Sequence, residues 1–124
     1  MRTIIAGSRS CGNIIQVAAA VKQSGFIITS VVSGTAPGAD RLGELWANLN
    51  SIPITRFPAD WDKFKKAAGY IRNEEMANNA DQVIVLWDGV SPGSKHMIDI
   101  ATRKGLAVSV YNFKPTEKEK EWYE

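Results

Sequence analysis

The sequence predicts an α/β fold in which helices cover both faces of a five-stranded, mainly parallel sheet. Two observations lead to this prediction: short apolar runs rich in β-branched residues recur five times, and segments with apolar residues at helical spacing separate them. Strands that alternate with such helices are joined by right-handed crossovers, which make neighbouring strands parallel. The predicted architecture is a Rossmann-like three-layer sandwich.

Each predicted element follows from its local pattern. The expected strands are residues 3–6, 28–32, 52–57, 82–87 and 107–111. Apolar residues at helical spacing predict helices across 14–21, 42–49 and around 97–101, each with one face that covers the sheet. A more polar helix is predicted over 70–80. Its expected buried contacts are Ile71, Met76, Ala77 and Ala80.

The length of 124 residues suits one domain with a sizeable core. We expect this domain over residues 1–113, followed by a charged C-terminal tail over 114–124 that either docks Trp122 through a short helix or frays. No apolar run approaches the ~20 residues of a membrane span, and the first apolar run is too short for a signal peptide. We therefore expect a cytoplasmic protein without membrane contact.

The charged and metal-ligating residues exclude several classes of partner. The net charge of +2 arises from 15 basic and 13 acidic residues, spread without a Lys/Arg block, which argues against nucleic acid. Cys11 is the single cysteine and His96 the single histidine, so the chain has neither an internal disulfide nor a Cys/His cluster with metal-ligand spacing. We expect no metal and no resident cofactor.

Glycine, hydroxyl and charged residues follow each of the first four predicted strands, in residues 7–10, 33–40, 58–61 and 88–94. In a parallel sheet these connections meet at the carboxyl edge of the strands, where ligands bind. Glycine allows close approach to the backbone, and the first turn of a helix presents free N–H groups with partial positive charge. The loops predict a cradle for a phosphate-bearing ligand, with tight turns and helix capping by Asp40 or Ser94 as the alternative.

The candidate ligand-binding residues come from these loops and from one helix. They are Gly7, Ser8, Arg9, Ser33, Gly34, Thr35, Gly38, Ala39, Asp40, Asp60, Trp61, Arg72, Asn73, Trp87, Gly89, Ser91, Gly93 and Ser94. No residue is singled out as catalytic. The sequence lacks both the dinucleotide G-x-G-x-x-G fingerprint and the Gly-Lys-Ser/Thr of a P-loop, which argues against ordinary NAD dehydrogenases and ATPases.

Several candidates have two interpretations that the sequence leaves open. Arg72 is expected either to bind phosphate in a bidentate manner or to form a surface ion pair with Glu75 or another nearby carboxylate. Trp61 and Trp87 are expected either to stack on a base or to pack in the core. Asp40 is expected to cap a helix or to accept from a ribose hydroxyl.

Five segments occur in a characteristic order: residues 7–9, 33–47, 57–61, 68–73 and 89–94. Together they resemble the SLOG superfamily, Rossmann-like proteins related to the LOG "lysine decarboxylase-like" enzymes, and most closely its YspA/cpYpsA-related branch. The resemblance runs from Arg2 to Tyr111. It implies binding of nucleotides or nucleotide-derived ligands at the strand edge, by sensors in some relatives and hydrolases in others.

The resemblance also implies how this chain differs from LOG enzymes, which cleave the N-glycosidic bond of nucleoside monophosphates. Arg72 matches their arginine on the third helix, but Met97 stands at the position of their glutamate. A thioether can neither accept a proton nor stabilise an oxocarbenium ion as a carboxylate does. Further departures are Tyr70, where the branch usually has proline, and residues 11–13, where it often has an acidic residue.

We therefore expect a sensor or binding module for a nucleotide-derived ligand. One alternative is an enzyme resembling nucleotide N-glycosidases or phosphoribohydrolases, with Glu75 or Asp60 as acid or base. The other is a single-stranded DNA-binding protein, since DNA-processing protein A has a similar Gly-rich loop. A homodimer or larger homo-oligomer that pairs through the helices flanking Trp46 is also expected.

Overall fold

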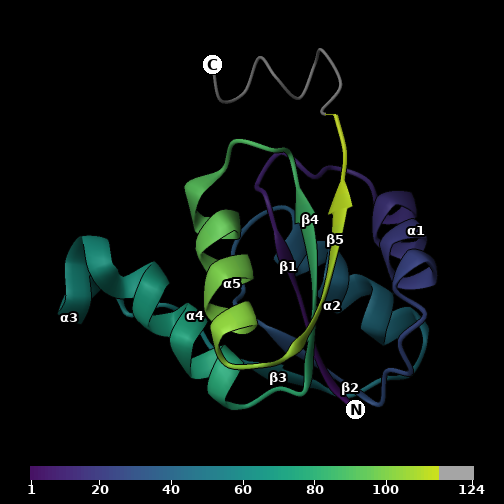
Figure 1. Cartoon of the computed structure of the whole chain (residues 1–124), viewed down its shortest axis with the longest axis horizontal. Helices are drawn as coiled ribbons and strands as arrows, with labels where there is room; N and C mark the ends of the chain where they lie inside the picture. The colour runs from purple at the N-terminus through teal and green to yellow at the C-terminus, as the bar shows by residue number, and fades with distance from the viewer. Residues whose placement is uncertain (115–124) are drawn as a thin grey trace.

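The computed structural model describes residues 1–114, which fold as the predicted three-layer sandwich (Figure 1). All five predicted strands are present, and the sheet has the order β3-β2-β1-β4-β5. Every neighbouring pair is parallel, so the sheet is wholly rather than mainly parallel. The strands are β1 (Arg2–Gly7), β2 (Ser30–Ser33), β3 (Ile54–Arg56), β4 (Gln82–Trp87) and β5 (Ala107–Asn112). The tail predicted over 114–124 lies, apart from Lys114, outside the described residues.

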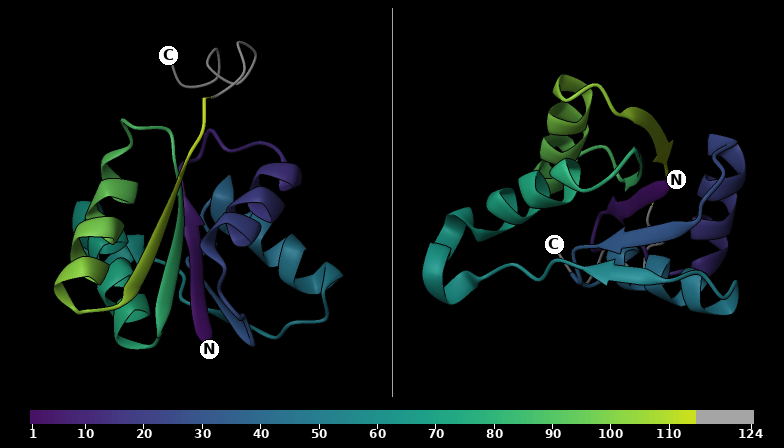
Figure 2. Two further views of the ribbon diagram at one scale, coloured as in Figure 1. Left: turned by 45° about the vertical axis from the view of Figure 1, so that its right-hand side comes forward. Right: turned by 90° about the horizontal axis from the view of Figure 1, so that it is seen from below.

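The four predicted helices are also present, and they cover the two faces of the sheet (Figure 2). Helices α1 (Ile14–Ser24) and α2 (Ala39–Leu49) pack on one face, whereas α4 (Ala68–Asn78) and α5 (Pro92–Arg103) pack on the other. Within residues 1–114 no helix has the length and apolar character that a membrane crossing requires.

The segment between β3 and α4 differs from the predicted loop. It contains the short helix α3 (Trp61–Phe64) and the 3₁₀ turn η1 (Lys65–Ala67). The Asp60 carboxylate accepts a hydrogen bond from the Lys63 amide at 3.1 Å and so caps α3. This segment projects away from the sheet (Figure 2).

Alternating strand residues are buried on opposite faces of the sheet. On the α4 and α5 side, Ile4, Val83 and Val85 pack with Met76 and Ile100. The α1 and α2 side buries a second set, which includes Ile5, Val17, Val31, Ile84 and Leu86. Because helices cover both faces, the central strands are continuous apolar runs instead of alternating apolar and polar residues.

The strand order places a crevice at the centre of the sheet. From β1 the chain winds outward through β2 to β3, and then it crosses to β4 and winds the other way to β5. The connections after the neighbouring strands β1 and β4 therefore lead to opposite faces of the sheet. Such a switch point is where open α/β sheets bind ligands.

Gly38 allows the loop before α2 to pack directly on the loop after β1. Its φ is +87°, and a Cβ at this position would lie 2.6 Å from both the Arg9 Cα and the Ser8 carbonyl oxygen. The next amide, that of Ala39, donates a hydrogen bond to the same carbonyl at 3.3 Å. The two loops are thus joined backbone to backbone.

We predict that Gly38→Ala lowers the free energy of unfolding by about 3 kcal/mol, because alanine is strained at this φ and its methyl group meets fixed backbone. Chemical denaturation measures the change. Gly93→Ala is the matched control, since nothing lies within 4 Å of a Cβ added there. Equal stability of Gly38→Ala and the wild-type protein would show that the two loops are not held in this close contact.

Candidate functional site

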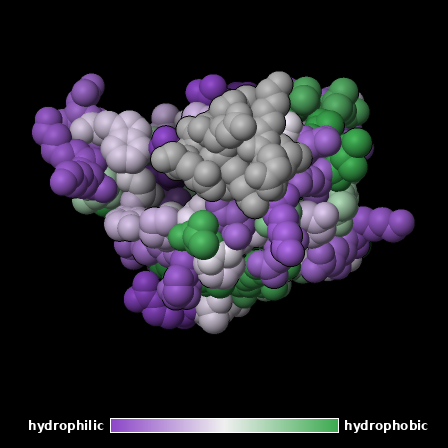
Figure 3. Space-filling view, turned by 90° about the horizontal axis from the view of Figure 1, so that it is seen from above, coloured by the Kyte–Doolittle hydropathy of each residue, from purple (hydrophilic) through white to green (hydrophobic). Residues whose placement is uncertain are grey.

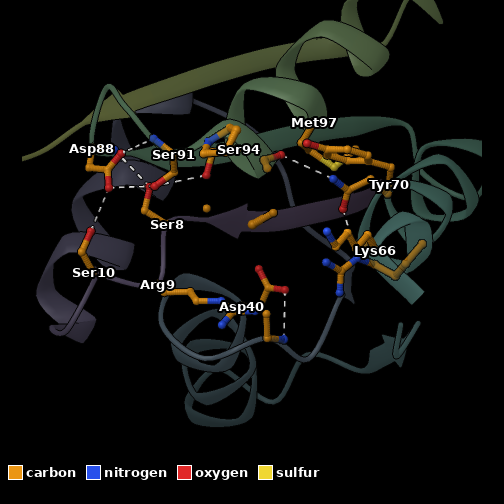
Figure 4. Close-up of a pocket in the computed structure, with 18 of the residues that line it drawn as sticks. Ser8, Arg9, Ser10, Asp40, Lys66, Tyr70, Asp88, Ser91, Ser94 and Met97 are labelled. Carbon is orange, nitrogen blue, oxygen red and sulfur yellow. Dashed lines mark hydrogen bonds between the residues drawn. The ribbon is translucent and has the colours of Figure 1, made fainter. Parts of the chain in front are cut away.

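A cavity of about 440 Å³ opens at the switch point, between the loops that follow β1 and β4 (Figure 4). Helices α4 and α5 and the α3 segment complete its wall. Pockets of this size hold small molecules. The lining residues are Ala6, Gly7, Ser8, Arg9, Ser10, Ala36, Asp40, Trp61, Lys66, Gly69, Tyr70, Arg72, Asn73, Asp88, Ser91, Pro92, Gly93, Ser94 and Met97.

The cavity brings together more than half of the predicted ligand-binding residues. Those that line it are Gly7, Ser8, Arg9, Asp40, Trp61, Arg72, Asn73, Ser91, Gly93 and Ser94. Those that do not are Ser33, Gly34, Thr35, Gly38, Ala39, Asp60, Trp87 and Gly89. The loops after β1 and β4 therefore lie at the cavity, and the loop after β2 contributes Ala36 and Asp40.

The predicted residues outside the lining have contacts elsewhere. The Ser33 hydroxyl donates to Glu44 at 2.6 Å, and the Trp87 indole N–H donates to the Ser91 carbonyl at 3.1 Å while the ring packs against the core. Asp60 caps α3. These interactions give each side chain a structural role near the site.

Ser8 connects the elements around the cavity. Its carbonyl accepts from the Cys11 and Ala39 amides, and its own amide donates to the Leu86 carbonyl at 2.9 Å. The buried hydroxyl accepts from the Asp88 amide at 3.1 Å and lies 3.4 Å from the Ser94 hydroxyl. Because the hydroxyl already accepts from Asp88, its proton is available to Ser94 or to a bound anion.

Asp88 shapes the turn that leads into α5. Its carboxylate accepts from the Val90 and Ser91 amides and from the Ser91 and Ser10 hydroxyls, at 2.8 to 3.1 Å. Burial alone would raise the pKa of Asp88, but these four hydrogen bonds outweigh it and lower the pKa. The turn holds the start of α5, with Gly93 and Ser94 in its first turn, at the cavity.

Arg72 is oriented toward the cavity by hydrogen bonds on two sides. Its Nη1 donates to the Gly34 carbonyl at 2.6 Å and its Nε to the Asn73 amide oxygen at 3.0 Å. Asn73 in turn donates toward Gly93 at 3.4 Å and His96 Nδ1 at 3.2 Å, which ties α4 to α5. Burial lowers the pKa of His96, which favours the neutral ring that can accept this bond. Because the Arg72 guanidinium group bonds to Gly34 and Asn73, its alternative role in a surface ion pair with Glu75 is disfavoured.

Asp40 is a buried carboxyl group whose charged neighbours are Arg72 and Glu44. It is 4% exposed, and its Oδ2 accepts from the Ala36 amide at 3.2 Å. Gly34 separates it from Arg72: a Cβ on Gly34 would lie 2.7 Å from both Asp40 Oδ2 and Arg72 Nη1. Burial raises the pKa of Asp40 to about 6, although Arg72 and the Ala36 amide oppose this increase. Gly38, not Asp40, is the N-cap of α2.

Sequence reasoning missed several lining residues. Ser10, Lys66, Tyr70, Asp88 and Met97 were not among the predicted site residues, yet all line the cavity. The spacing of Asp88 and Ser91 around Gly89 is typical of a side-chain-stabilised turn and could have identified Asp88. Lys66 belongs to the projecting segment, whose helical structure the sequence did not indicate.

We predict that Asp40→Asn stabilises the protein above pH 6. The pKa of Asp40 is about 6 when folded and 3.8 by default when unfolded, so the folded state binds this proton more tightly. The resulting stabilisation is full below pH 3.8 and is lost as the pH rises through 6, a difference of about 3 kcal/mol. The asparagine side chain of the variant does not titrate and avoids that loss.

Denaturation of both proteins between pH 4 and pH 8 measures this difference. Asp99→Asn, which removes an exposed carboxylate paired with Lys95, is the control and should change stability by less than about 0.5 kcal/mol. If the stability of Asp40→Asn changes with pH in the same way as that of the wild type, a buried Asp40 carboxyl group with a raised pKa is contradicted.

Comparisons with known proteins identify the family of this chain. A sequence model of the YspA, cpYpsA-related SLOG family matches residues 1–64, about half of the chain. The Gene 61 protein of Mycobacterium phage D29 is 35% identical over 92 residues, which cover 68% of this chain and 73% of the relative. No solved structure matches. The chain belongs to the YspA, cpYpsA-related SLOG family.

Proposed function

We propose that the chain binds a nucleotide or a nucleotide-derived, phosphate-bearing ligand in the switch-point cavity, as a sensor or binding module. The observation that carries the proposal is the convergence of Ser8, the first turn of α5 and two guanidinium groups on one cavity. Hydroxyl groups, helix N-terminal amides and arginines are the donors that proteins use for phosphate.

The phosphate is expected between the first turn of α5 and the arginines. Gly93 and Ser94 provide amides at the positive end of the helix dipole. Arg9 and Arg72 are close enough for the charge of Arg9 to lower the pKa of Arg72, after burial as the main cause. An anion between the two guanidinium groups relieves this repulsion.

We predict that Arg9→Ala weakens binding of a nucleoside monophosphate about 10-fold, the effect of losing one charge-assisted contact. Arg9 is exposed, so its removal should leave the fold intact. Isothermal titration calorimetry measures the affinity.

Arg41→Ala is the matched control, because Arg41 is also exposed but lies outside the cavity, where its Nε donates to the Thr35 carbonyl. Loss of affinity in both variants, or in neither, would contradict a phosphate site at Arg9. Wild-type protein that no nucleotide stabilises in a thermal-shift screen would overturn the proposed function.

A nucleotide N-glycosidase is the second candidate, and Asp40 is the observation that favours it. The carboxyl group lines the cavity, and its pKa of about 6 lies near the range of general acids and bases. Glu75 is exposed outside the lining and Asp60 caps α3, so neither is the acid or base we favour. In this reaction water replaces the base at the ribose C1, releasing free base and ribose phosphate. Chromatography of nucleoside monophosphates incubated with the protein tests this candidate.

Two expectations about partners follow. Binding of single-stranded DNA is disfavoured by the low net charge, and a small ligand enclosed by the cavity should lose less affinity with added salt than DNA does.

Self-association is favoured by Leu45 and Leu49, which are exposed on α2 near Trp46. Sedimentation equilibrium measures the oligomeric state.

A further inference from the structure

The cavity has two chemically different sides (Figure 4). Ser8, Ser10 and Asp88 lie on one side, from the loops after β1 and β4. Lys66 and Tyr70 lie on the other, and Trp61 and Gly69 belong to the same segment, from α3 to the first turn of α4. The first side presents hydroxyls and helix amides, whereas the second presents two aromatic rings together with the Lys66 ammonium group. A ligand that contacts both sides therefore has an anionic end and a flat apolar end.

The two aromatic side chains are exposed although they line the cavity. Trp61 is 51% exposed and Tyr70 is 47% exposed. The other exposed residues within 61–70 are, apart from Ala67, charged. Figure 3 shows the hydrophilic outer end of this segment. A tryptophan in such a segment contributes little to the core. Its large flat surface is available to a planar ligand.

Tyr70 is held in place from behind. Its ring packs on the His96 ring, with centroids 4.4 Å apart and planes tilted by 45°. His96 is itself hydrogen bonded to Asn73, the residue that orients Arg72. The phenol ring and the guanidinium group are thus positioned by one connected set of side chains.

Gly69 lies between the indole ring of Trp61 and the guanidinium group of Arg72. A Cβ built on Gly69 would lie 3.5 Å from the indole Cη2 of Trp61 and 3.8 Å from Nη2 of Arg72. The edge of the indole and the guanidinium group are therefore neighbours. A phosphate on Arg72 leaves the rest of a nucleotide within reach of the indole.

We propose that Trp61 and Tyr70 form a base-stacking subsite, so that the ligand is a mononucleotide and not a sugar phosphate or inorganic phosphate. This inference rests on the proposed function and adds the class of ligand to it. The base stacks on the aromatic rings while the phosphate binds at Arg9, Arg72 and the first turn of α5. The cavity volume of about 440 Å³ suits a ligand of this size.

Calorimetry with two kinds of probe tests the subsite. AMP, GMP, CMP and UMP carry a base, whereas ribose 5-phosphate retains the phosphate and the sugar but has none. Wild-type protein should bind at least one of the four nucleotides about 10-fold or more tightly than ribose 5-phosphate, since stacking on one aromatic ring contributes that much.

Substitutions then locate the effect. Trp61→Ala and Tyr70→Ala should each weaken nucleotide binding about 5- to 100-fold and change ribose 5-phosphate binding less than about twofold. Trp61→Phe should retain most of the affinity. Ile15→Ala, which truncates an exposed apolar side chain of α1 outside the cavity, is the control and should change neither. Both aromatic residues are half-exposed, and a thermal melt of each variant verifies that it folds.

The outcomes separate the subsite from the proposed function. If nucleotides and ribose 5-phosphate bind equally well and the aromatic variants bind like the wild type, the subsite is overturned and the phosphate site stands. If Trp61→Ala weakens both probes equally, the indole is not a base platform, and the subsite is again overturned. If wild-type protein binds no probe at all, the proposed function fails and the subsite fails with it.

Discussion

The hydrogen bonds of Ser8 are the interactions on which the site depends. This residue is 2% exposed and connects β4, the start of α2, the Asp88 turn and α5 through its amide, carbonyl and hydroxyl groups. The partners come from the β4–α5 segment and from the start of α2, so this part of the cavity wall forms only when β1, β4 and the start of α2 are assembled. Loss of the hydroxyl would leave the partly buried Asp88 amide without this partner, which costs about 1 kcal/mol. Ser8 also lines the cavity, so one residue both links these elements and forms part of the cavity wall.

The buried charged groups that line the cavity lower the stability of the protein, and the fold itself does not require them. An asparagine at position 40 would accept the same hydrogen bond from the Ala36 amide without a buried charge, yet the chain has an aspartate whose pKa rises to about 6. Arg72 is likewise buried deeply enough to lower its pKa. Proteins tolerate such destabilising charges chiefly where function needs them. The pair flanking Gly34 therefore marks this cavity as a candidate functional site.

The fold could be predicted almost entirely, because the apolar runs of the strands reflect burial on both faces. The site could be predicted only in part. Ser8, Gly93 and Ser94 are predicted correctly as lining residues because parallel strands bring their loops to one edge of the sheet, independently of side-chain orientation. Trp87 was expected as a possible base platform, but the structure places its ring against the core, since a strand end leaves open which way a side chain turns. Lys66 was missed because its place at the cavity depends on the α3 segment, a tertiary feature without a periodic signal. Tyr70 was missed because a helical pattern alone does not show which side chains of α4 line a cavity.

The sequence predicts one side of the cavity better than the other because the two sides are built from different parts of the fold. The side formed by the loops after β1 and β4 follows from topology: a parallel sheet with a switch point creates a crevice, and the helix that starts there adds its dipole. The aromatic side comes instead from residues 61–70, which project from the sheet and contribute little to either core cluster. Changes in that segment cost the fold little, whereas changes at Ser8 or Gly38 disturb several elements at once. The strand edge thus fixes one side of the cavity, and the projecting segment shapes the other side at little cost to the fold.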